Sequence, residues 1–574
     1  MHKKLYIIAC FLLMISIITQ AQKNIYISND GADSNNGTAE STPIKTIAQL
    51  NTINLSAGDK VLFRRGDVFI GQVEVKSSGS SGNPITYGAY GSGSNPIISG
   101  AELLNPVNSS ANIYQSSVTK PILAVYINGN KASLARQPNS GFYTISSGGK
   151  KSVTDGSNLN NTTDYFKGAN IRIRSTNYTF EARKITSSSG NTVTWNKDLQ
   201  FNANAGYGYY LDNKRDFLDN QGEWYYDAAT DKVLIYSQNT PGDSYGSVYE
   251  NGLNFHTNVS HIVIDGLSFQ YQFYDGVYLY GTCQNITITN CEFNNIERHG
   301  IAFTGSFTDV DISRNIFSNV YGTGIISNNI TNGTIEYNNF NDIGMMQGYG
   351  AVFGFPINNN TGFSINGKNN HVHHNVVNNT GYNGIRVDGE GNLIEKNLVK
   401  NSCLKLNDGG GIYFWGTGTK NSTFRYNIID NVVGNLEGTP SGYIIASLYF
   451  DNGSNNVTAE NNVMVNSTNL GMLINRGTTS HTLKNNLIHG FKQTGILFAD
   501  NTTMTRSFNN LVSGNTLSST VLDANFISKS TTNSIDNYDP GTFSSNTYFN
   551  PYNPVGFKST KTGSGTVHRD FSLQ

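Results

Sequence analysis

The stretch Glu460-Asn461-Asn462-Val463 returns 24 residues later as Lys484-Asn485-Asn486-Leu487, and 24 residues after that as Phe508-Asn509-Asn510-Leu511. In each copy an apolar strand ends at Asn, and an apolar residue follows. Asn suits such a bend because it tolerates a left-handed backbone and its side chain bonds locally. The slot recurs between about residues 262 and 512, at Asn290, Asn315, Asn338, Asn375, Asn397, Asn427, Asn462, Asn486 and Asn510.

A second register of small residues opens one strand in every repeat. A fixed period of this size indicates a solenoid, and the alternation of period two inside each repeat indicates strands. Stacked coils bury a continuous core, so the sequence predicts an all-β right-handed parallel β-helix. The alternative, an Asn-rich β-sandwich, is disfavoured because sandwiches lack a register shared by so many repeats. The small residues are Gly276, Gly300, Gly324, Ala351, Gly384, Gly411, Ser447, Gly471 and Gly495.

The first residues of the chain have the pattern of a secretory signal peptide. Lys3 and Lys4 precede an apolar run over residues 5–18, and Thr19-Gln20-Ala21 offers a cleavage site. This run is short for a membrane span. We therefore expect a secreted or periplasmic protein without a membrane span. The formal charge of −1 gives no reason to expect a nucleic-acid partner.

Regions without the Asn register flank and interrupt the solenoid pattern. Residues 101–250 have longer strands and predict an inserted all-β, sandwich-like accessory domain. Two solenoid coils carry long loops, over residues 355–370 and 433–444, and loops of this length on a regular scaffold tend to wall a site. The predicted organisation is a signal peptide at 1–21, an N-terminal cap and first coils at 22–100, the insertion at 101–250, the main β-helix at 251–512 and C-terminal coils with a cap at 513–574.

Alternation after each small residue places the third and fifth positions on the outside of the coil. In the middle coils these positions carry aromatic rings beside carboxylates and an arginine, a mixture that suits a sugar-binding groove. His299 precedes Gly300 on the same side, and we expect it to contact substrate, with a surface histidine or a satisfied histidine as the alternative. The outward residues are Arg386, Tyr413 and Tyr449 at the third position, and Asp388, Trp415 and Asp451 at the fifth.

Three aspartates in neighbouring coils are candidates for acid–base chemistry. Glycoside hydrolysis needs two carboxyl groups facing one bond, one of them protonated and the other ionised. Asp408 is followed by three glycines, which let its loop fold close to the strands that carry Asp388 and Asp451. Aspartate is also a common turn residue, so each of the three has a structural alternative. On the residues alone, all three aspartates are candidates for the pair.

Several motifs resemble secreted β-helix carbohydrate enzymes of Bacteroidetes type. They include Gly222-Glu223-Trp224-Tyr225-Tyr226-Asp227, Asp408-Gly409-Gly410-Gly411-Ile412-Tyr413 and Leu448-Tyr449-Phe450-Asp451-Asn452-Gly453. The chain is most similar to β-helix glycoside hydrolases with an inserted β-sandwich, such as families 120 and 141. In such enzymes an Asp pair on neighbouring coils is catalytic, which implies Asp408 and Asp451 here. We therefore predict that these two are catalytic, with Asp388 tuning or replacing one of them.

Three functions compete on this sequence. The first is a secreted glycoside hydrolase acting on a plant or algal polysaccharide or its oligosaccharides, as a monomer without cofactor or metal. The second is a polysaccharide lyase acting on a uronate-containing glycan, with a base drawn from Arg386, Lys396 or Lys405 and with Ca²⁺ as a possible cofactor. The third is a glycan-binding protein without catalysis, which needs only the aromatic residues. The outward columns contain one Arg and no Lys, which favours the hydrolase.

Overall fold

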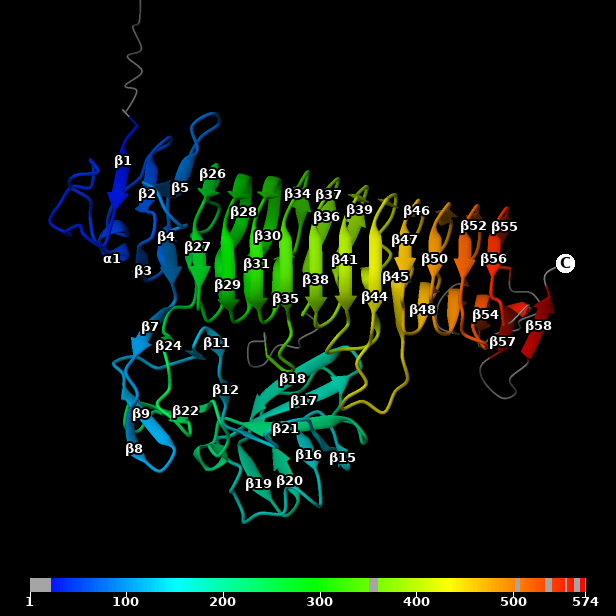
Figure 1. The fold of residues 1–574 in the computed structure, drawn as a ribbon, viewed down its shortest axis with the longest axis horizontal. Helices are drawn as coiled ribbons and strands as arrows, with labels where there is room; N and C mark the ends of the chain where they lie inside the picture. The colour runs from blue at the N-terminus through cyan, green and yellow to red at the C-terminus, as the bar shows by residue number, and fades with distance from the viewer. Residues whose placement is uncertain are drawn as a thin grey trace, which may run out of the picture.

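Parallel strands stack into a long solenoid, and a smaller all-β region lies beneath it (Figure 1). The fold is that of a computed structural model, which describes residues 22–349, 360–500, 506–531, 539–552, 555–561 and 568–572. The helices in these residues are α1 (Ile47–Leu50) and the short 3-10 helix Arg215–Phe217; the other regular elements are strands. The predicted all-β parallel β-helix is confirmed. The predicted signal peptide at 1–21 lies outside the described residues.

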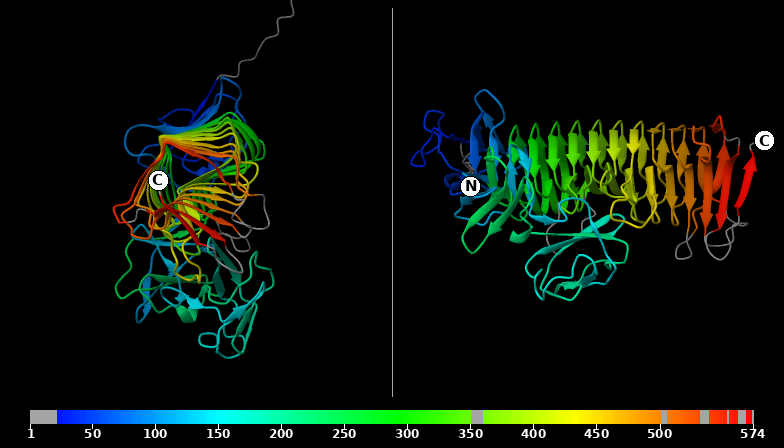
Figure 2. Two further views of the ribbon diagram at one scale, coloured as in Figure 1. Left: turned by 90° about the vertical axis from the view of Figure 1, so that its right-hand side faces the viewer. Right: turned by 60° about the horizontal axis from the view of Figure 1, so that its bottom comes forward.

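Each regular coil contributes three short strands. In one coil these are β42 (Gly409–Trp415), β43 (Thr423–Arg425) and β44 (Ile428–Val432). Strands equivalent to β42 and β43 join a 27-stranded sheet, and strands equivalent to β44 form a separate 13-stranded sheet. Viewed from the C-terminal end, the coils lie one behind another (Figure 2).

The strands opened by small residues share one sheet, as predicted. Ile385 pairs with Ile412 in a parallel register, and Ile412 pairs in turn with Leu448. These strands are β28 (Asp275–Thr289), β30 (His299–Ser313), β32 (Thr323–Ser327), β36 (Phe363–Lys368), β39 (Ile385–Glu390), β42, β45 (Ile445–Asp451), β48 (Leu470–Asn475) and β51 (Thr494–Ala499). The facing sheet contains β27 (Ser268–Gln270), β29 (Glu292–Ile296), β31 (Ile316–Val320), β35 (Asn339–Ile343), β38 (Val376–Thr380), β41 (Leu398–Ser402), β44, β47 (Val463–Val465), β50 (Leu487–His489) and β53 (Thr516–Ser518).

Close packing between the two sheets explains the recurring glycine. A Cβ atom at Gly300 would lie 2.5 Å from Cδ1 of Phe317, and one at Gly411 would lie 2.3 Å from Cγ2 of Ile429. Real Cβ atoms do not approach other carbon atoms so closely, because protein interiors are already packed to crystal density. The glycine register is therefore a packing requirement of the coil.

The predicted register was wrong in one coil. Phe363 pairs with Ile325 on one side and with Ile385 on the other, so Gly362 fills the slot assigned to Ala351. Ala351 itself lies outside the described residues. The extra residues of this coil precede its strand, so the outward positions are Ser364 and Asn366.

Buried asparagines form a ladder along one corner of the coils. The backbone N–H of each donates to the side-chain oxygen of the next, at 2.9–3.1 Å. Two predicted members are wrong. Cys291 takes the place assigned to Asn290, and Asn510 belongs to a second ladder, where it accepts from the N–H of His481. The first ladder contains Asn315, Asn338, Asn375, Asn397, Asn427, Asn462, Asn486, Asn515 and Asn546.

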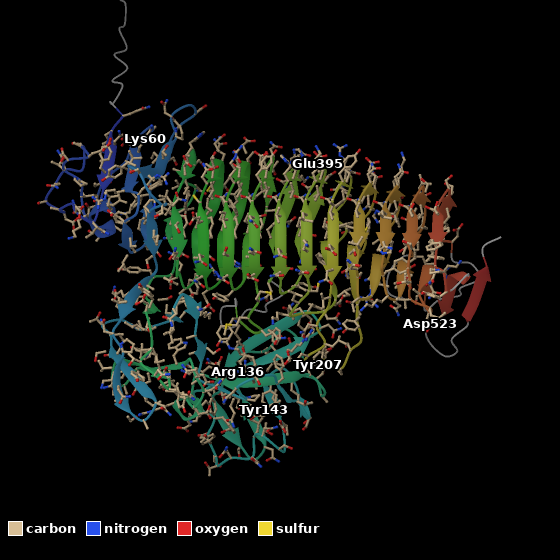
Figure 3. The ribbon with its side chains drawn as sticks, in the orientation of Figure 1. Lys60, Arg136, Tyr143, Tyr207, Glu395 and Asp523 are labelled. Atoms are coloured by element: carbon tan, nitrogen blue, oxygen red, sulfur yellow. The ribbon has the colours of Figure 1, made fainter. Side chains whose placement is uncertain are left out.

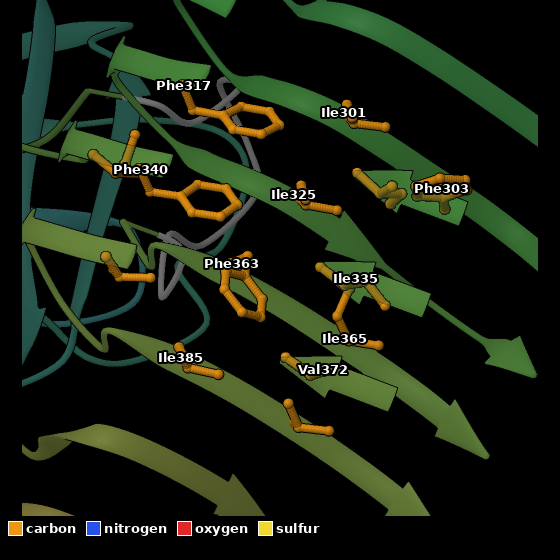
Figure 4. Close-up of a cluster of buried hydrophobic side chains, with 14 of the residues drawn as sticks. Ile301, Phe303, Phe317, Ile325, Ile335, Phe340, Phe363, Ile365, Val372 and Ile385 are labelled. Atoms are coloured by element: carbon orange, nitrogen blue, oxygen red, sulfur yellow. The ribbon is translucent and has the colours of Figure 1, made fainter. Parts of the chain in front are cut away.

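Stacked apolar side chains fill the interior of the solenoid. Phe293, Phe317 and Phe340 lie one above another, with ring centroids 4.6 and 4.5 Å apart. Figure 4 shows Phe317 and Phe340 facing the isoleucines of the neighbouring sheet. The packing gives a continuous hydrophobic core from Ile25 to Ile527, as stacking of identical coils requires.

The first coils of the solenoid precede the insertion in sequence. Strand β5 (Ile85–Tyr90) pairs in parallel with β26 (Ile262–Asp265), and β6 (Ile97–Ser99) pairs with β27. The chain therefore leaves the solenoid after β6 and returns at β25 (Leu253–Phe255) in the next coil. At the other end, β57 (Val555–Lys561) and β58 (His568–Ser572) close the stack as an antiparallel pair.

The insertion contains two small two-sheet units, one nested in the other, where the sequence predicted a single sandwich. Leu104, Val125, Trp224 and Ile235 share one core, so both ends of the insertion build the outer unit. Residues from Ala135 to Phe217 build the inner unit around its own core. Figure 3 labels Arg136, Tyr143 and Tyr207 in the region beneath the solenoid. The outer unit contains β7 (Ala101–Leu104), β8 (Val107–Ser110), β9 (Ile113–Ser117), β10 (Val125–Ile127), β11 (Asn130–Lys131), β12 (Ser133–Leu134), β22 (Glu223–Asp227), β23 (Lys232–Tyr236) and β24 (Ser244–Ser247); the inner unit contains β13 (Arg136–Gln137), β14 (Tyr143–Thr144), β15 (Ser147–Gly148), β16 (Ser152–Thr154), β17 (Asn170–Thr176), β18 (Thr179–Lys184), β19 (Ser187–Ser189), β20 (Thr192–Thr194) and β21 (Gly208–Asp212).

A buried arginine joins the inner unit to the long loop after β44. Arg174 is fully buried, and its guanidinium donates to the carbonyl oxygen of Asn435 at 2.8 Å and to that of Glu437. Asn177 strengthens this junction, because its side-chain oxygen accepts from Thr439 at 2.8 Å. The loop over residues 433–444 therefore lies against the insertion, as the yellow segment in Figure 1 shows.

Candidate active site

A cleft of about 600 Å³ opens where the middle coils, the loop before β45 and the insertion meet. Its floor is the outer face of β42, β45 and β48. The cleft brings together six of the eight predicted site residues, Asp408, Asp451, Arg386, Tyr413, Trp415 and Tyr449.

Asp451, at the end of β45, is held by hydrogen bonds from neutral donors. The Tyr413 hydroxyl donates to its Oδ2 at 2.8 Å, and the Asn475 amide donates to its Oδ1 at 2.7 Å. Burial raises the pKa of Asp451, while these two hydrogen bonds and the charge of Arg476 lower it. Donors aimed at both oxygens stabilise the ionised form, which suits a base or nucleophile.

Asp408 occupies a sharp turn directly before β42. Its φ of 61° is left-handed, a conformation that Asp and Asn adopt more readily than other non-glycine residues. The hydroxyl of Tyr449 donates to Oδ1 of Asp408 at 3.2 Å, while the hydroxyl of Tyr382 donates to its backbone carbonyl. Burial, followed by the nearby charge of Asp451, raises the pKa of Asp408 to about 6.

The two carboxyl groups therefore differ in ways that suit different roles. Asp408 has one long hydrogen bond and a raised pKa, so it holds a proton more readily than an ordinary aspartate does. Asp451 accepts two short hydrogen bonds, one at each oxygen. The groups are connected, because the Asn475 amide that bonds Asp451 also lies 3.3 Å from the Tyr449 hydroxyl. One acid and one base in a shared cleft is the pattern found at glycosidase sites.

Asp388 does not line this cleft. Its Oδ2 lies 2.7 Å from Nε of Arg386, and its Oδ1 accepts the backbone N–H of Trp415 at 2.7 Å. Burial raises the pKa of Asp388, and the charge of Arg386 opposes that rise. Asp388 and Arg386 line two neighbouring hollows, which continue along the sheet past Asn366.

The outward register of the aromatic residues agrees with the prediction. Trp415 is 49% exposed, whereas its neighbour Phe414 is buried in the core. Tyr413 and Tyr449 also point outward but are buried, with ring centroids 5.1 Å apart. They are covered because the sheet carries a second, outer apolar cluster that includes Leu470 and Leu473.

The insertion supplies one wall of the cleft, which the sequence did not reveal. Tyr178, Gln200 and Phe201 line it from the inner unit, and Tyr178 packs edge-on against Phe201 at 5.8 Å. Tyr443 and Ile444 of the predicted loop over residues 433–444 line it as well. The other predicted wall, residues 355–370, is described only from residue 360, and Thr361, Ser364 and Asn366 of this segment line the neighbouring hollows.

Other polar residues of the cleft were absent from the prediction as well, among them Asn475, Arg476 and Tyr382. Asn475 occupies the fifth position after the small residue of its coil, and strand alternation predicts that this position faces outward. Arg476 follows it in sequence, and Tyr382 precedes β39. Because both lie at bends, strand alternation gives no information about their direction.

The structure does not bring His299 to the cleft. Its side chain is 6% exposed, and its Nδ1 accepts the backbone N–H of Thr323 in the next coil at 3.3 Å. Burial lowers the pKa of His299 well below its usual range, so the ring is neutral. The satisfied histidine considered as the alternative is therefore the correct description.

No group of three or more His, Cys, Asp or Glu side chains is arranged to hold a metal ion in the described part of the chain. Within the same residues, no helix has the length and apolar character needed to cross a bilayer.

Comparison with known proteins identifies the solenoid. The family model described as "Right handed beta helix region" matches residues 251–433 and 361–546, which together span just over half of the chain. A search of curated proteins gave no match.

The solved structures that resemble this chain do so at low sequence identity. One titled "Glycoside hydrolase" superposes with a TM-score of 0.60 at 14% identity, covering 81% of this chain and 96% of its own. XylC, solved with xylose, gives a TM-score of 0.47 at 12% identity over 91% of this chain and 86% of its own. The lacto-N-biosidase of glycoside hydrolase family 136 from Eubacterium ramulus gives 0.38 at 14% identity over 93% of this chain and 67% of its own.

Proposed function

This chain belongs to the right-handed β-helix family, and we propose that it is a secreted glycoside hydrolase with Asp408 and Asp451 as its catalytic pair. The carrying observation is the contrast between two carboxyl groups in one cleft. Burial raises the pKa of both groups, that of Asp408 to about 6, but only Asp451 accepts hydrogen bonds at both oxygens, and these oppose the rise of its pKa. Asp408 acts as the general acid, and Asp451 acts as the base or the nucleophile.

The reaction follows from these roles. Asp408 gives its proton to the oxygen of the leaving sugar as the glycosidic bond breaks. Ionised Asp451 either activates a water molecule or attacks the anomeric carbon, and its negative charge stabilises the developing oxocarbenium ion. Trp415, Tyr178 and Tyr443 offer aromatic faces to the sugar rings. The resemblance to families 120 and 141 supports this proposal through the shared plan of a β-helix with an insertion.

The lyase remains the second candidate, because Arg386 and Arg476 both line the cleft. The described lining contains no lysine, and Arg386 is already paired with Asp388. The hydrolase is therefore favoured, because a lyase needs a base beside the uronate and the other arginine of the cleft, Arg476, carries a permanently charged guanidinium, which is a poor base.

Screening the purified protein on plant and algal polysaccharides tests the proposal. New reducing ends without ultraviolet-absorbing unsaturated products would support a hydrolase, and proton NMR of the first product would give the anomeric outcome. Unsaturated products would identify a lyase instead. Binding without turnover on every glycan bound would identify a glycan-binding protein. The double variant Asp408→Asn/Asp451→Asn is the negative control.

A further inference from the structure

Arg476 lines the cleft close to both catalytic candidates. It directly follows Asn475, which bonds Asp451, and its backbone is left-handed with a φ of 53°. The side chain is exposed and lines the same cleft as both catalytic candidates. Its charge opposes the rise that burial causes in the pKa of Asp408 and of Asp451, so it lies within electrostatic range of both.

The guanidinium of Arg476 has no acidic partner among the described residues, because none of their carboxylates lies within salt-bridge distance of it. The contrast with Arg386 is informative. Arg386 is held by Asp388 at 2.7 Å and lies above the ring of Tyr413 at 5.4 Å, so its donors are partly used. An arginine that served only to hold an aspartate would be expected to pair as Arg386 does.

Electrostatics also restricts what can bind here. The charged side chains of the described lining are Asp408, Asp451, Arg386 and Arg476. An anionic sugar beside ionised Asp451 would be repelled unless a cation faced it. Arg476 is the charged group available for this, and its planar fork of donors matches a carboxylate or a sulfate.

We propose that Arg476 forms a subsite for an anionic substituent, a carboxylate or a sulfate ester, on a sugar bound beside Asp408 and Asp451. This inference rests on the proposed function and narrows its substrate class to acidic glycans. The guanidinium binds the anion, and the amide side chains of Asn469 and Gln493, which line the same cleft, flank the sugar that carries it.

Binding titrations in the Asp408→Asn background test this subsite without turnover. The probes are an oligogalacturonate and its methyl ester, and a sulfated galactan oligosaccharide and its desulfated form. Arg476→Gln should weaken binding of the acidic member of at least one pair by roughly 10- to 100-fold, the range of a hydrogen bond to a charged group. Binding of the neutral members should change by less than about threefold, since they lose no charged contact.

Arg314→Gln is the matched control, because Arg314 is also an exposed arginine with a left-handed backbone, at φ 58°, and does not line the cleft. It should leave all four affinities unchanged. Loss confined to the oligogalacturonate would identify a carboxylate, and loss confined to the sulfated probe would identify a sulfate.

Two outcomes would overturn the inference. One is equal weakening of acidic and neutral probes by Arg476→Gln, and the other is the absence of any preference for an acidic probe. If the parent protein cleaves a neutral glycan in either case, the hydrolase proposal stands alone. If acidic probes bind through Arg476 but the parent protein releases no reducing ends from any glycan, the hydrolase proposal fails and the subsite stands.

Discussion

Two carboxylate sites lie side by side on the outer face of one sheet, and they are built differently. Asp388 is paired with Arg386 at 2.7 Å, whereas the carboxylates of Asp408 and Asp451 are hydrogen-bonded to tyrosines and an amide. A cation in contact favours the ionised form of a carboxylate through its full charge, whereas neutral donors favour it through hydrogen bonds alone. Asp408 and Asp451, which have no cation in contact, are therefore suited to proton transfer. The ion pair of Asp388 and Arg386 is suited to shaping the groove.

The largest expected effect separates these two sites. Asp408→Asn and Asp451→Asn should each lower kcat by about 10³-fold or more on a glycan that the parent protein hydrolyses, because each removes a group that acts on the scissile bond. Asp388→Asn should lower kcat by less than about 10-fold, since it alters only the groove. Steady-state kinetics on the three variants, with circular dichroism to verify folding, would measure the difference. An equally large loss of kcat in Asp388→Asn would contradict the different roles assigned to the two sites.

Removing one hydroxyl group from the cleft should lower activity by a smaller factor. Tyr413→Phe deletes the 2.8 Å hydrogen bond to Asp451 and should lower kcat/KM by roughly 10- to 100-fold. That bond lowers the pKa of Asp451, so its loss should move the acidic limb of the pH profile upward.

Tyr449→Phe is the companion variant, because Tyr449 donates to Asp408. Its hydrogen bond lowers the pKa of Asp408, which burial raises to about 6, so its removal should move the alkaline limb upward. Activity profiles between pH 4 and 9 would show the two limbs. Identical profiles in the two variants would contradict the assignment of separate roles.

Trp415 connects the two sites, because its backbone bonds Asp388 while its side chain lines the cleft. Trp415→Ala should raise KM by roughly 10-fold with kcat within about threefold, since a lost ring contact weakens binding without removing a reacting group. Its melting temperature should change little, because the ring is 49% exposed. Phe414→Ala is the matched control, since loss of a buried Phe costs about 3–5 kcal/mol of folding free energy. A Trp415→Ala variant as unstable as this control would contradict the outward register.

The smallest expected effect concerns stability. The pKa of Asp408 is higher in the folded chain than in the unfolded chain, so its ionisation above about pH 6 destabilises the fold. Asp408→Asn should therefore raise the free energy of unfolding by about 1–2 kcal/mol at pH 8 and leave it unchanged at pH 4. Asp388→Asn should change the free energy of unfolding at pH 8 in the same direction but by less, because burial also raises the pKa of Asp388 and the charge of Arg386 opposes that rise. Chemical denaturation of both variants at pH 4 and pH 8 would measure the two changes, and a loss of stability in Asp408→Asn at pH 8 would contradict the raised pKa of Asp408.

Periodicity made the solenoid predictable, and its interruptions explain the errors. Each coil repeats the same packing problem, so the glycine that avoids Phe317 or Ile429 recurs at a fixed place in the sequence. The extra residues before Gly362 displaced that slot from Ala351, and no periodic signal marks where such a loop ends. Asn290 was misassigned because Cys291 fills the ladder position there.

The candidate site was predictable only where it follows the repeat. Strand alternation placed Tyr413, Trp415 and Asp451 on the outer face, and the structure gathers them in one cleft. Strand alternation gave no information about Tyr178, because the contact between the insertion and the solenoid joins segments more than 200 residues apart. Tyr178 and Phe201 line the same cleft as Asp408, and no local pattern could reveal this part of its surroundings.

Leaving-group dependence tests the central assignment most directly. If Asp408 is the general acid, Asp408→Asn should lose about 10³-fold in kcat/KM on a glycan with a sugar leaving group, because that oxygen needs a proton. An aryl glycoside of the same sugar has an acidic phenol as its leaving group, so bond breaking needs no proton. On this substrate Asp408→Asn should lose less than about 10-fold in kcat/KM. Asp451→Asn should lose activity on both. Equal losses of Asp408→Asn on the two substrates would contradict its role as the acid.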